Sequence, residues 1–292
     1  MTPFQQGLKS TFFRQKNGIW GEMMKSWFAG IFLFFLSVTT FAADEGRFFY
    51  HGNGKLKISN ASKLRGLSPR LIALLDYLQE QLSHGNGTIK ILSGYRSPQY
   101  NENLRKQGRL AGKASLHLEG MAADFVMEGV SAKRMWEYAR QLNCCGVGFY
   151  HGNAIHLDTG PPRFWDETTS KVYTDISTHN KQIYAVTRYD IYHPGENLVF
   201  QIVRATEYPF GIKNEVRIMK NGEEWKKVRL DNKGDCIVVH NREEAQQFAI
   251  PISQLLDGGA QQFSIQISFC DKPSDEMPDQ ILSNPFVIVT QE

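Results

Sequence analysis

The stretch SLHLEGMAADF, residues 115–125, places a histidine and an aspartate seven positions apart among small and apolar residues. If MAADF forms a strand, its two-residue period puts Ala122 and Asp124 on one face and Phe125 on the other. His117 and Asp124 are then either a polar pair satisfied inside a core or two ligands of a metal ion that needs a third. The interpretation of this stretch governs both the predicted sheet and the predicted site.

A second stretch, AIHLDTG at 154–160, offers the third ligand. Strand periodicity puts His156 and Asp158 on one face and Ile155 and Leu157 on the other. If the two strands are neighbours, His117, Asp124 and His156 converge, and two imidazoles with one carboxylate form a ligand set that a catalytic zinc uses while it keeps a position for water. An ordinary hydrogen-bonded pair of His156 and Asp158 is the alternative.

Helix and strand signals alternate before residue 166. LSPRLIALLDYLQEQL (67–82) carries an N-cap serine, a proline at the first helical position and a leucine face typical of a core helix. TIKIL (88–92) predicts a strand, capped helices are predicted at 97–108 and 131–142, and GVGFY (146–150) predicts a strand antiparallel to AIHLDTG. We therefore expect an α+β fold for residues 44–166, a small antiparallel sheet with flanking helices.

Helical periodicity disappears after residue 180. Segments such as NLVFQIVRA (197–205) and FSIQISF (263–269) predict strands, and Asn221–Gly222 predicts a hairpin turn. We expect an all-β domain at 180–292, a sandwich of immunoglobulin-like size, after a linker at 167–179. We find no cluster of reactive residues in it and predict no particular partner for it.

The charge distribution separates a basic leader from a neutral body. Four basic residues and one acidic residue give residues 1–42 a net charge of +3, which leaves 29 basic and 29 acidic residues downstream. A neutral body offers no electrostatic case for a nucleic-acid partner.

Residues 1–43 predict an N-terminal extension and a signal peptide. From Met24 the chain has one lysine, an apolar run that ends at Val38, and small residues up to Ala42 and Ala43, where cleavage is expected. An uncleaved membrane anchor is the alternative, but a run of about 12 apolar residues is shorter than the roughly 20 of a spanning helix. We expect a periplasmic or secreted bacterial protein with no stable membrane span after cleavage.

Four cysteines would enter this oxidising compartment. Cys236 and Cys270 fall in strand-like segments and could form a disulfide. We expect Cys144 and Cys145 to be buried thiols, because a bond between adjacent cysteines distorts the peptide that joins them. Neither pair has the spacing of a metal site.

Three motifs occur in an order that points to a known family: ILSGYRSPQYN (91–101), ASLHLEGMAADF (114–125) and GVGFYHGNAIHLDTGPPRFW (146–165). Over roughly residues 45–166 they resemble the D-alanyl-D-alanine peptidase-like zinc metallopeptidases of bacterial cell walls, most closely the murein endopeptidase branch. The resemblance implies that His117, Asp124 and His156 bind Zn²⁺.

The resemblance also implies roles for two further residues. Arg96 matches the arginine that stabilises the developing oxyanion in this family, and Ser115 matches a position that lines the site. Loss of such a guanidinium typically reduces the rate on the order of a hundredfold or more. The residues themselves allow simpler roles, because Arg96 could pair with a carboxylate after its strand and Ser115 could only cap a turn.

The general base does not carry over from the family. Relatives use a glutamate three residues before the last ligand or a histidine two residues before it, and here Asn153 and Ala154 occupy those positions. Asp158 and His151 are the candidates, with Asp158 preferred because it shares a strand face with His156. Asp158 could equally orient the imidazole of His156.

We therefore predict an exported zinc peptidase that hydrolyses peptidoglycan stem peptides or their cross-links. Whether it cuts a D,D or an L,D bond stays open at this point. A catalytically inactive peptidoglycan-binding protein with the same fold is one alternative, favoured by the missing glutamate. A purely structural protein without metal is another. Metal analysis distinguishes the purely structural protein, which binds no zinc, from the peptidase and the inactive binding protein. Turnover of muropeptides then distinguishes the peptidase from the inactive binding protein.

Overall fold

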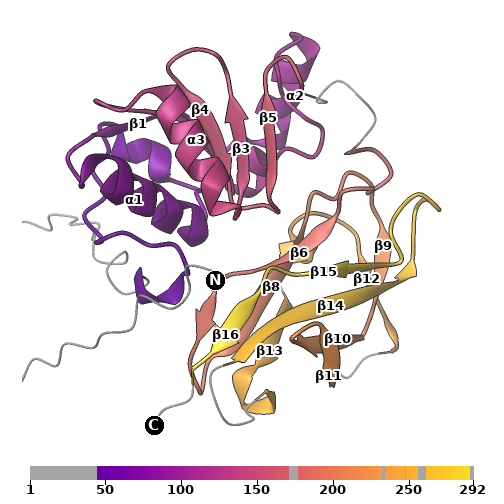
Figure 1. The fold of residues 1–292 in the computed structure, drawn as a ribbon. Coiled ribbons are helices and arrows are strands. Elements are labelled where there is room, and N and C mark those ends of the chain that lie inside the picture. The colour runs from indigo at the N-terminus through magenta and orange to yellow at the C-terminus, as the bar shows by residue number, and fades with distance from the viewer. Residues whose placement is uncertain (1–44, 171–176, 232–233, 247, 256–260, 290–292) are drawn as a thin grey trace, which may run out of the picture. The chain divides into compact units, whose positions relative to one another are not determined.

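The computed structural model describes residues 45–170, 177–231, 234–246, 248–255 and 261–289. The predicted leader and part of the predicted linker lie outside these residues. The described part contains no helix that is both long and apolar enough to cross a membrane. It has a mixed α+β architecture with several sheets, as predicted (Figure 1).

The first half of the described chain is built on a five-stranded sheet with the order β1-β2-β4-β3-β5. Its strands are β1 (Ile89–Ser93), β2 (Ala122–Met127), β3 (Gly146–Phe149), β4 (Ile155–Asp158) and β5 (Arg163–Asp166). The prediction of an antiparallel sheet is wrong for β5, which pairs with β3 in parallel. The chain reverses after β4 and continues on the far side of β3, so β5 runs in the same direction as β3.

Three helices and two short 3-10 turns surround this sheet in the described residues. They are α1 (Pro69–Ser83), α2 (Pro98–Lys106), α3 (Ala132–Leu142), η4 (Ala61–Leu64) and η5 (Leu116–Glu119). Ser68, Ser97 and Ser131 cap the three helices with their hydroxyl groups, as their sequence positions predicted. In Figure 1, α1 and α3 cover one face of the sheet.

Strand alternation assigns the two faces of the sheet different roles. Phe125, Val147 and Leu157 belong to a buried hydrophobic cluster with the leucines of α1 and with Met135 of α3. Asp124 and His156, at alternate positions, lie directly opposite each other on β2 and β4 and point to the other face. The candidate ligands are therefore on the sheet face that α1 and α3 leave uncovered.

The second half of the described chain consists of β-strands. An eight-stranded sheet contains the path β11-β10-β14-β16-β7 together with β9, β12 and β15, and a three-stranded sheet has the order β13-β8-β6. Both sheets contribute to one hydrophobic cluster that includes Phe200, Ile218 and Phe286. Asn221 and Gly222 have positive φ between β10 and β11, which confirms the predicted hairpin turn.

The strands of this half have the following bounds: β6 (Tyr184–Thr187), β7 (Ile191–Tyr192), β8 (Asn197–Val203), β9 (Phe210–Lys213), β10 (Glu215–Lys220), β11 (Glu223–Arg229), β12 (Cys236–Val239), β13 (Phe248–Pro251), β14 (Gln261–Asp271), β15 (Gln280–Leu282) and β16 (Phe286–Ile288). Three further 3-10 turns are η3 (Glu45–Arg47), η7 (Glu244–Gln246) and η8 (Ile252–Gln254).

Contacts join the two halves into one compact unit. Glu119 of η5, whose side chain is only 3% exposed, forms an ion pair with Arg242 and accepts a hydrogen bond from Gln246. Arg70 of α1 is paired with Asp190 at 2.9 Å. The domain boundaries at 166 and 180 therefore stay predictions.

The structure confirms the prediction for one cysteine pair and contradicts the prediction for the other. Cys236 and Cys270 form the disulfide that the sequence allowed. The expectation for Cys144 and Cys145 is wrong, because they are bonded to each other. They lie in the bend between α3 and β3 rather than in an extended strand. Consecutive side chains point to opposite sides of a strand, whereas a bend can bring both sulfurs to one side.

Candidate metal centre

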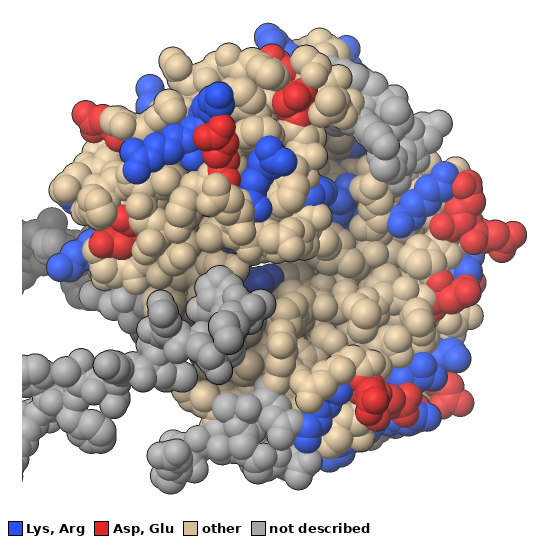
Figure 2. All heavy atoms as spheres, viewed as in Figure 1, with Lys and Arg blue, Asp and Glu red and all other residues tan. Residues whose placement is uncertain are grey.

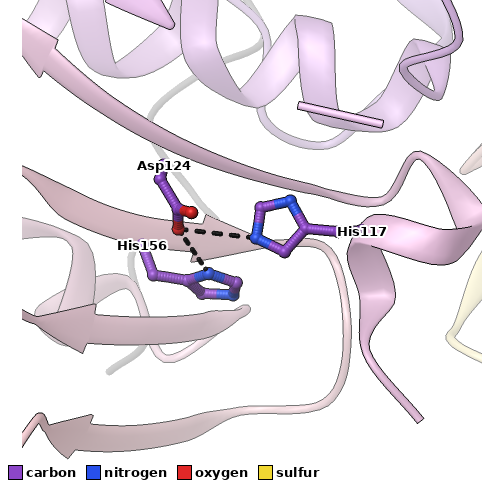
Figure 3. A group of neighbouring side chains, drawn as sticks. All are labelled: His117, Asp124 and His156. Atoms are coloured by element: carbon purple, nitrogen blue, oxygen red, sulfur yellow. Dashed lines mark hydrogen bonds and ion pairs between the residues drawn. The ribbon is translucent and has the colours of Figure 1, made fainter. Parts of the chain in front are cut away.

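The side chains of His117, Asp124 and His156 converge on one point (Figure 3). Each offers one ligand atom, and these atoms lie within 4.8 Å of one another. Asp124 Oδ1 is 3.0 Å from His156 Nδ1 and 3.4 Å from His117 Nε2. β2 supplies Asp124, β4 supplies His156, and the η5 turn supplies His117.

Each histidine has its second ring nitrogen bonded to a fixed acceptor. His117 Nδ1 lies 2.8 Å from the carbonyl oxygen of Gly94, and His156 Nε2 lies 2.8 Å from Asp158 Oδ2. Such acceptors fix the tautomer and the ring orientation of metal-binding histidines. With these nitrogens donating, His117 Nε2 and His156 Nδ1 remain available as ligands, and they are the two nitrogens that face Asp124.

Burial shapes the charge of the three side chains. Burial lowers the pKa of His117 and would by itself raise that of Asp124. The neighbouring His117 and the hydrogen bonds from both histidines outweigh this effect and hold the pKa of Asp124 well below its ordinary value. His156 differs from His117, because burial would lower its pKa but its hydrogen bonds to Asp124 and Asp158 raise it. A metal ion requires neutral imidazoles and a carboxylate, so its binding would displace the protons that the histidines share with Asp124.

Arg96 is nearly buried beside the ligands, with 7% of its surface exposed. Its Nη2 donates to Asp124 Oδ2 at 2.7 Å, and its Nε donates to Ser93 Oγ. Arg96 therefore does pair with a carboxylate, as the simpler of its two expected roles required. The carboxylate is that of Asp124, a candidate metal ligand.

These residues border a cavity of about 300 Å³. Its lining includes His117, His156, Arg96 and Ser115, four of the residues that the sequence analysis singled out. Small-molecule sites commonly occupy about 300–1,000 Å³. The cavity therefore has the volume of a small ligand site next to the three candidate ligands.

Residues 57–165 match a family described as Peptidoglycan L,D-endopeptidase MepK. The predicted resemblance is confirmed over this region. Peptidoglycan L,D-endopeptidase MepK of Escherichia coli (strain K12) is 37% identical over 106 residues, which cover 36% of this chain and 58% of that protein. The probable MepK of Haemophilus influenzae is 34% identical over 111 residues, which cover 38% of this chain and 60% of that protein. The chain thus spans about three fifths of the length of these relatives.

The MepK match ends at residue 165, before β6 to β16 begin. Two solved structures align with the chain, the extracellular domains 3–5 of Drosophila OTK and the fibronectin(III)-like modules of Clostridium thermocellum CbhA. Their sequence identities are 16% and 10%. The first alignment covers 35% of this chain and 33% of that chain, and the second covers 58% and 60%. Each has a TM-score of 0.19, so neither supports an argument about the fold.

Asp158, one of the two candidate bases in this MepK-like region, is fully buried. Besides its bond to His156 it accepts two hydrogen bonds from Arg163, Nη1 to Oδ1 at 2.9 Å and Nη2 to Oδ2 at 2.5 Å. Burial would raise the pKa of Asp158, but Arg163 and His156 together hold it below its ordinary value. The geometry is that of a carboxylate that orients a histidine.

His151, the other candidate, is not part of the cluster of three candidate ligands. It has a positive φ in the turn between β3 and β4, and its ring is tilted by 51° against that of Phe149, with 4.7 Å between the centroids. Its Nε2 is 3.8 Å from Asp166 Oδ2. His151 is not among the residues that line the cavity.

Three side chains near the ligands were not predicted from the sequence. Tyr150 donates from its hydroxyl to Asp124 Oδ1 at 2.9 Å, Arg163 holds Asp158, and the ring of Trp165 lies 5.0 Å from that of His156. All three lie within the motif GVGFYHGNAIHLDTGPPRFW. Strand periodicity could have placed Arg163 and Trp165 on one face of β5, but only the parallel pairing with β3 brings that face to the ligands.

Two glycines of β3 make this arrangement possible. Gly146 and Gly148 each lie between β4 and β5, where Gly146 is opposite Asp158 and Arg163 and Gly148 is opposite His156 and Trp165. A Cβ atom on Gly146 would lie 2.3 Å from Asp158 Oδ2, and one on Gly148 would lie 2.6 Å from the Trp165 ring. The missing side chains leave the space in which the groups from β4 and β5 meet.

The charges on the visible surface do not form a basic face. On the side shown in Figure 2, basic and acidic side chains are interspersed among uncharged ones. This distribution agrees with the equal numbers of basic and acidic residues after the leader.

Proposed function

We propose that the chain is an exported zinc-dependent endopeptidase that hydrolyses peptide bonds in peptidoglycan. The observation that carries the proposal is the convergence of His117, Asp124 and His156 beside a cavity lined by Arg96, within a region that matches MepK. We take an L,D linkage as the bond that is cut, because the matched relatives are named L,D-endopeptidases.

The three side chains fit a zinc ion by their chemistry. Two imidazole nitrogens and a carboxylate oxygen are ordinary zinc ligands, and three protein ligands are typical of a catalytic site. A bound zinc would acidify a water molecule and polarise the carbonyl of the scissile bond. His117 and His156 are already oriented for this role by Gly94 and Asp158.

Three further residues would orient the ligands, contact the substrate or stabilise charge that develops on it. Arg96 holds Asp124 and borders the cavity, so its guanidinium can also stabilise negative charge that develops on the substrate oxygen. Ser115 borders the same cavity as a contact for the substrate. We assign Asp158 to the orientation of His156, because its carboxylate is buried and already bonded to His156 and Arg163.

A catalytically inactive peptidoglycan-binding protein is the second candidate. The observation that favours it is the absence of any Asp or Glu among the described residues that line the cavity. Such a protein would keep the zinc and the cavity and would bind muropeptides without cutting them.

The deciding experiment uses the protein without its predicted leader, loaded with zinc and desalted. We expect about one zinc per chain by elemental analysis, and its loss in His117→Ala and His156→Ala. Digestion of purified peptidoglycan should yield products with cleaved cross-links, and a chelator should stop the reaction. A metal-free wild-type protein would overturn the site, and zinc-loaded protein that binds muropeptides without turnover would support the second candidate.

Export has its own test. Expression of the full chain in a bacterium should give a mature protein in the periplasm or the medium whose N-terminus follows Ala42 or Ala43. N-terminal sequencing of the isolated protein measures this directly.

A further inference from the structure

Five of the described residues that line the cavity beside the candidate ligands lie beyond the MepK-like region: Thr169, Ser170, Ser177, Gln182 and Arg204. Arg204 directly follows β8, and Gln182 precedes β6. Both belong to the β-rich half, and the family match ends at residue 165. This half therefore contributes part of the wall of the proposed active site.

Arg204 differs from the other two arginines that line the cavity. Arg96 is paired with Asp124, and Arg163 is paired with Asp158. The guanidinium of Arg204 donates from Nη2 to the amide oxygen of Gln182, and its Nε is buried without a partner among the described residues. Burial and the charge of Arg163 lower the pKa of Arg204 more than the neighbouring Tyr184 and Asp158 raise it.

The backbone holds Arg204 in this position. Its φ is +64°, in the left-handed region that a residue with a side chain rarely adopts. The carboxylate of Glu119 accepts a hydrogen bond from the Arg204 backbone, and Glu119 belongs to the same η5 turn as His117. Strained backbone of this kind persists where the surrounding structure fixes it, and it is found most often at functional sites.

The guanidinium of Arg204 is partly buried, its Nη2 is bonded to an uncharged amide, and it has no carboxylate partner among the described residues. Guanidinium groups bind carboxylates with two parallel hydrogen bonds, and such pairs are among the strongest in proteins. No Asp or Glu is present among the described lining residues to form such a pair. The missing partner is therefore expected from the ligand.

We propose that Arg204, supported by Gln182, binds a free carboxylate of the peptide substrate close to the bond that is cut. This inference rests on the proposed function, and it extends that function by making the β-rich half part of substrate recognition. A peptide that carries a carboxylate near the scissile bond should be preferred over the same peptide with a carboxamide at that position.

The test compares three synthetic peptides with the same scissile bond. The first has its free carboxylates, the second has the C-terminal carboxylate replaced by a carboxamide, and the third has a side-chain carboxylate replaced. The zinc-loaded wild-type protein should hydrolyse the first peptide about 10- to 100-fold more efficiently in kcat/KM than one of the two amides, as expected for a hydrogen-bonded charged group. The amide that is disfavoured identifies the carboxylate.

Arg204→Gln should bring this ratio close to one. Arg188→Gln is the matched control, because Arg188 is an exposed arginine in the same half of the chain and should keep the wild-type ratio. Thermal unfolding and zinc content establish that each variant is folded and loaded. If Arg204→Gln does not fold, Arg204→Lys, which keeps the charge but not the paired donors, should reduce the ratio by a smaller amount.

Calorimetric binding of the same peptides separates this inference from the proposed function. Hydrolysis without discrimination between carboxylate and amide would overturn the Arg204 subsite and leave the peptidase proposal intact. An unchanged preference in Arg204→Gln would also overturn it. Binding that prefers the carboxylate through Arg204 without any hydrolysis would support the subsite and overturn the peptidase proposal.

Discussion

Asp158 is the residue for which the sequence left two roles open, general base or orientation of His156. Its buried carboxylate is bonded to His156 Nε2 and to Arg163, so we expect Asp158→Asn to disturb the orientation of a zinc ligand. Zinc affinity should fall about ten- to a hundredfold, and excess zinc should restore much of the turnover. Turnover measured across a zinc titration, with His151→Ala as the control, tests this. A zinc-replete Asp158→Asn protein that stays about a hundredfold slower would indicate a role in proton transfer instead.

Arg96 is expected to act in two ways. Arg96→Ala removes a hydrogen bond to Asp124 and a charge beside the cavity, so turnover should fall on the order of a hundredfold or more, with a smaller loss of zinc affinity. Turnover measured at saturating zinc separates the two effects. Unchanged turnover in this variant would limit Arg96 to holding Asp124.

At the scale of the elements, β3 sets the distance between the groups of β4 and β5. A methyl group at Gly148 would collide with the ring of Trp165, so Gly148→Ala should displace Trp165 from His156 and destabilise the fold by about 1–3 kcal/mol. Thermal unfolding and tryptophan fluorescence measure these effects, and Gly152→Ala, whose new Cβ would have one neighbour at 3.9 Å, is the control. The double variant Gly148→Ala/Trp165→Ala should show strong coupling. Additive effects would mean that the two residues do not compete for space.

At the scale of the whole molecule, the pair of Glu119 and Arg242 connects the β-rich half to the turn that carries His117. Arg242→Ala should leave a buried carboxylate unpaired and lower the free energy of unfolding by about 3 kcal/mol in urea denaturation. Burial already raises the pKa of Glu119 above its ordinary value. The loss should therefore grow as the pH rises above that wild-type pKa, because the wild-type carboxylate then ionises beside Arg242 while the unpaired one stays protonated. The loss should level off above the higher pKa of the unpaired carboxylate.

Two variants complete this test. Glu119→Gln in the Arg242→Ala background should recover part of the lost stability, because an amide is less costly to bury than a charge. Arg134→Ala, on the exposed surface of α3, should change the stability by less than about 0.5 kcal/mol. Equal losses in Arg242→Ala and Arg134→Ala would show that the buried pair contributes nothing measurable.

The sequence by itself determined the elements and the faces of the sheet. Serine caps, leucine spacing and two-residue alternation depend on neighbours along the chain, so they predicted α1, β2 and β4 and put Asp124 and His156 on one face. The motifs also identified the three candidate ligands. Local patterns of this kind are visible without knowledge of the fold.

Only the tertiary structure decided which groups from distant segments meet. The parallel pairing of β5 with β3 brings Arg163 to Asp158, and the bend after α3 joins Cys144 to Cys145. The contact of η5 with the β-rich half brings Arg204 to the cavity. These contacts depend on backbone conformation, strand pairing and packing in the folded chain. The spacing of residues along the sequence does not reveal them.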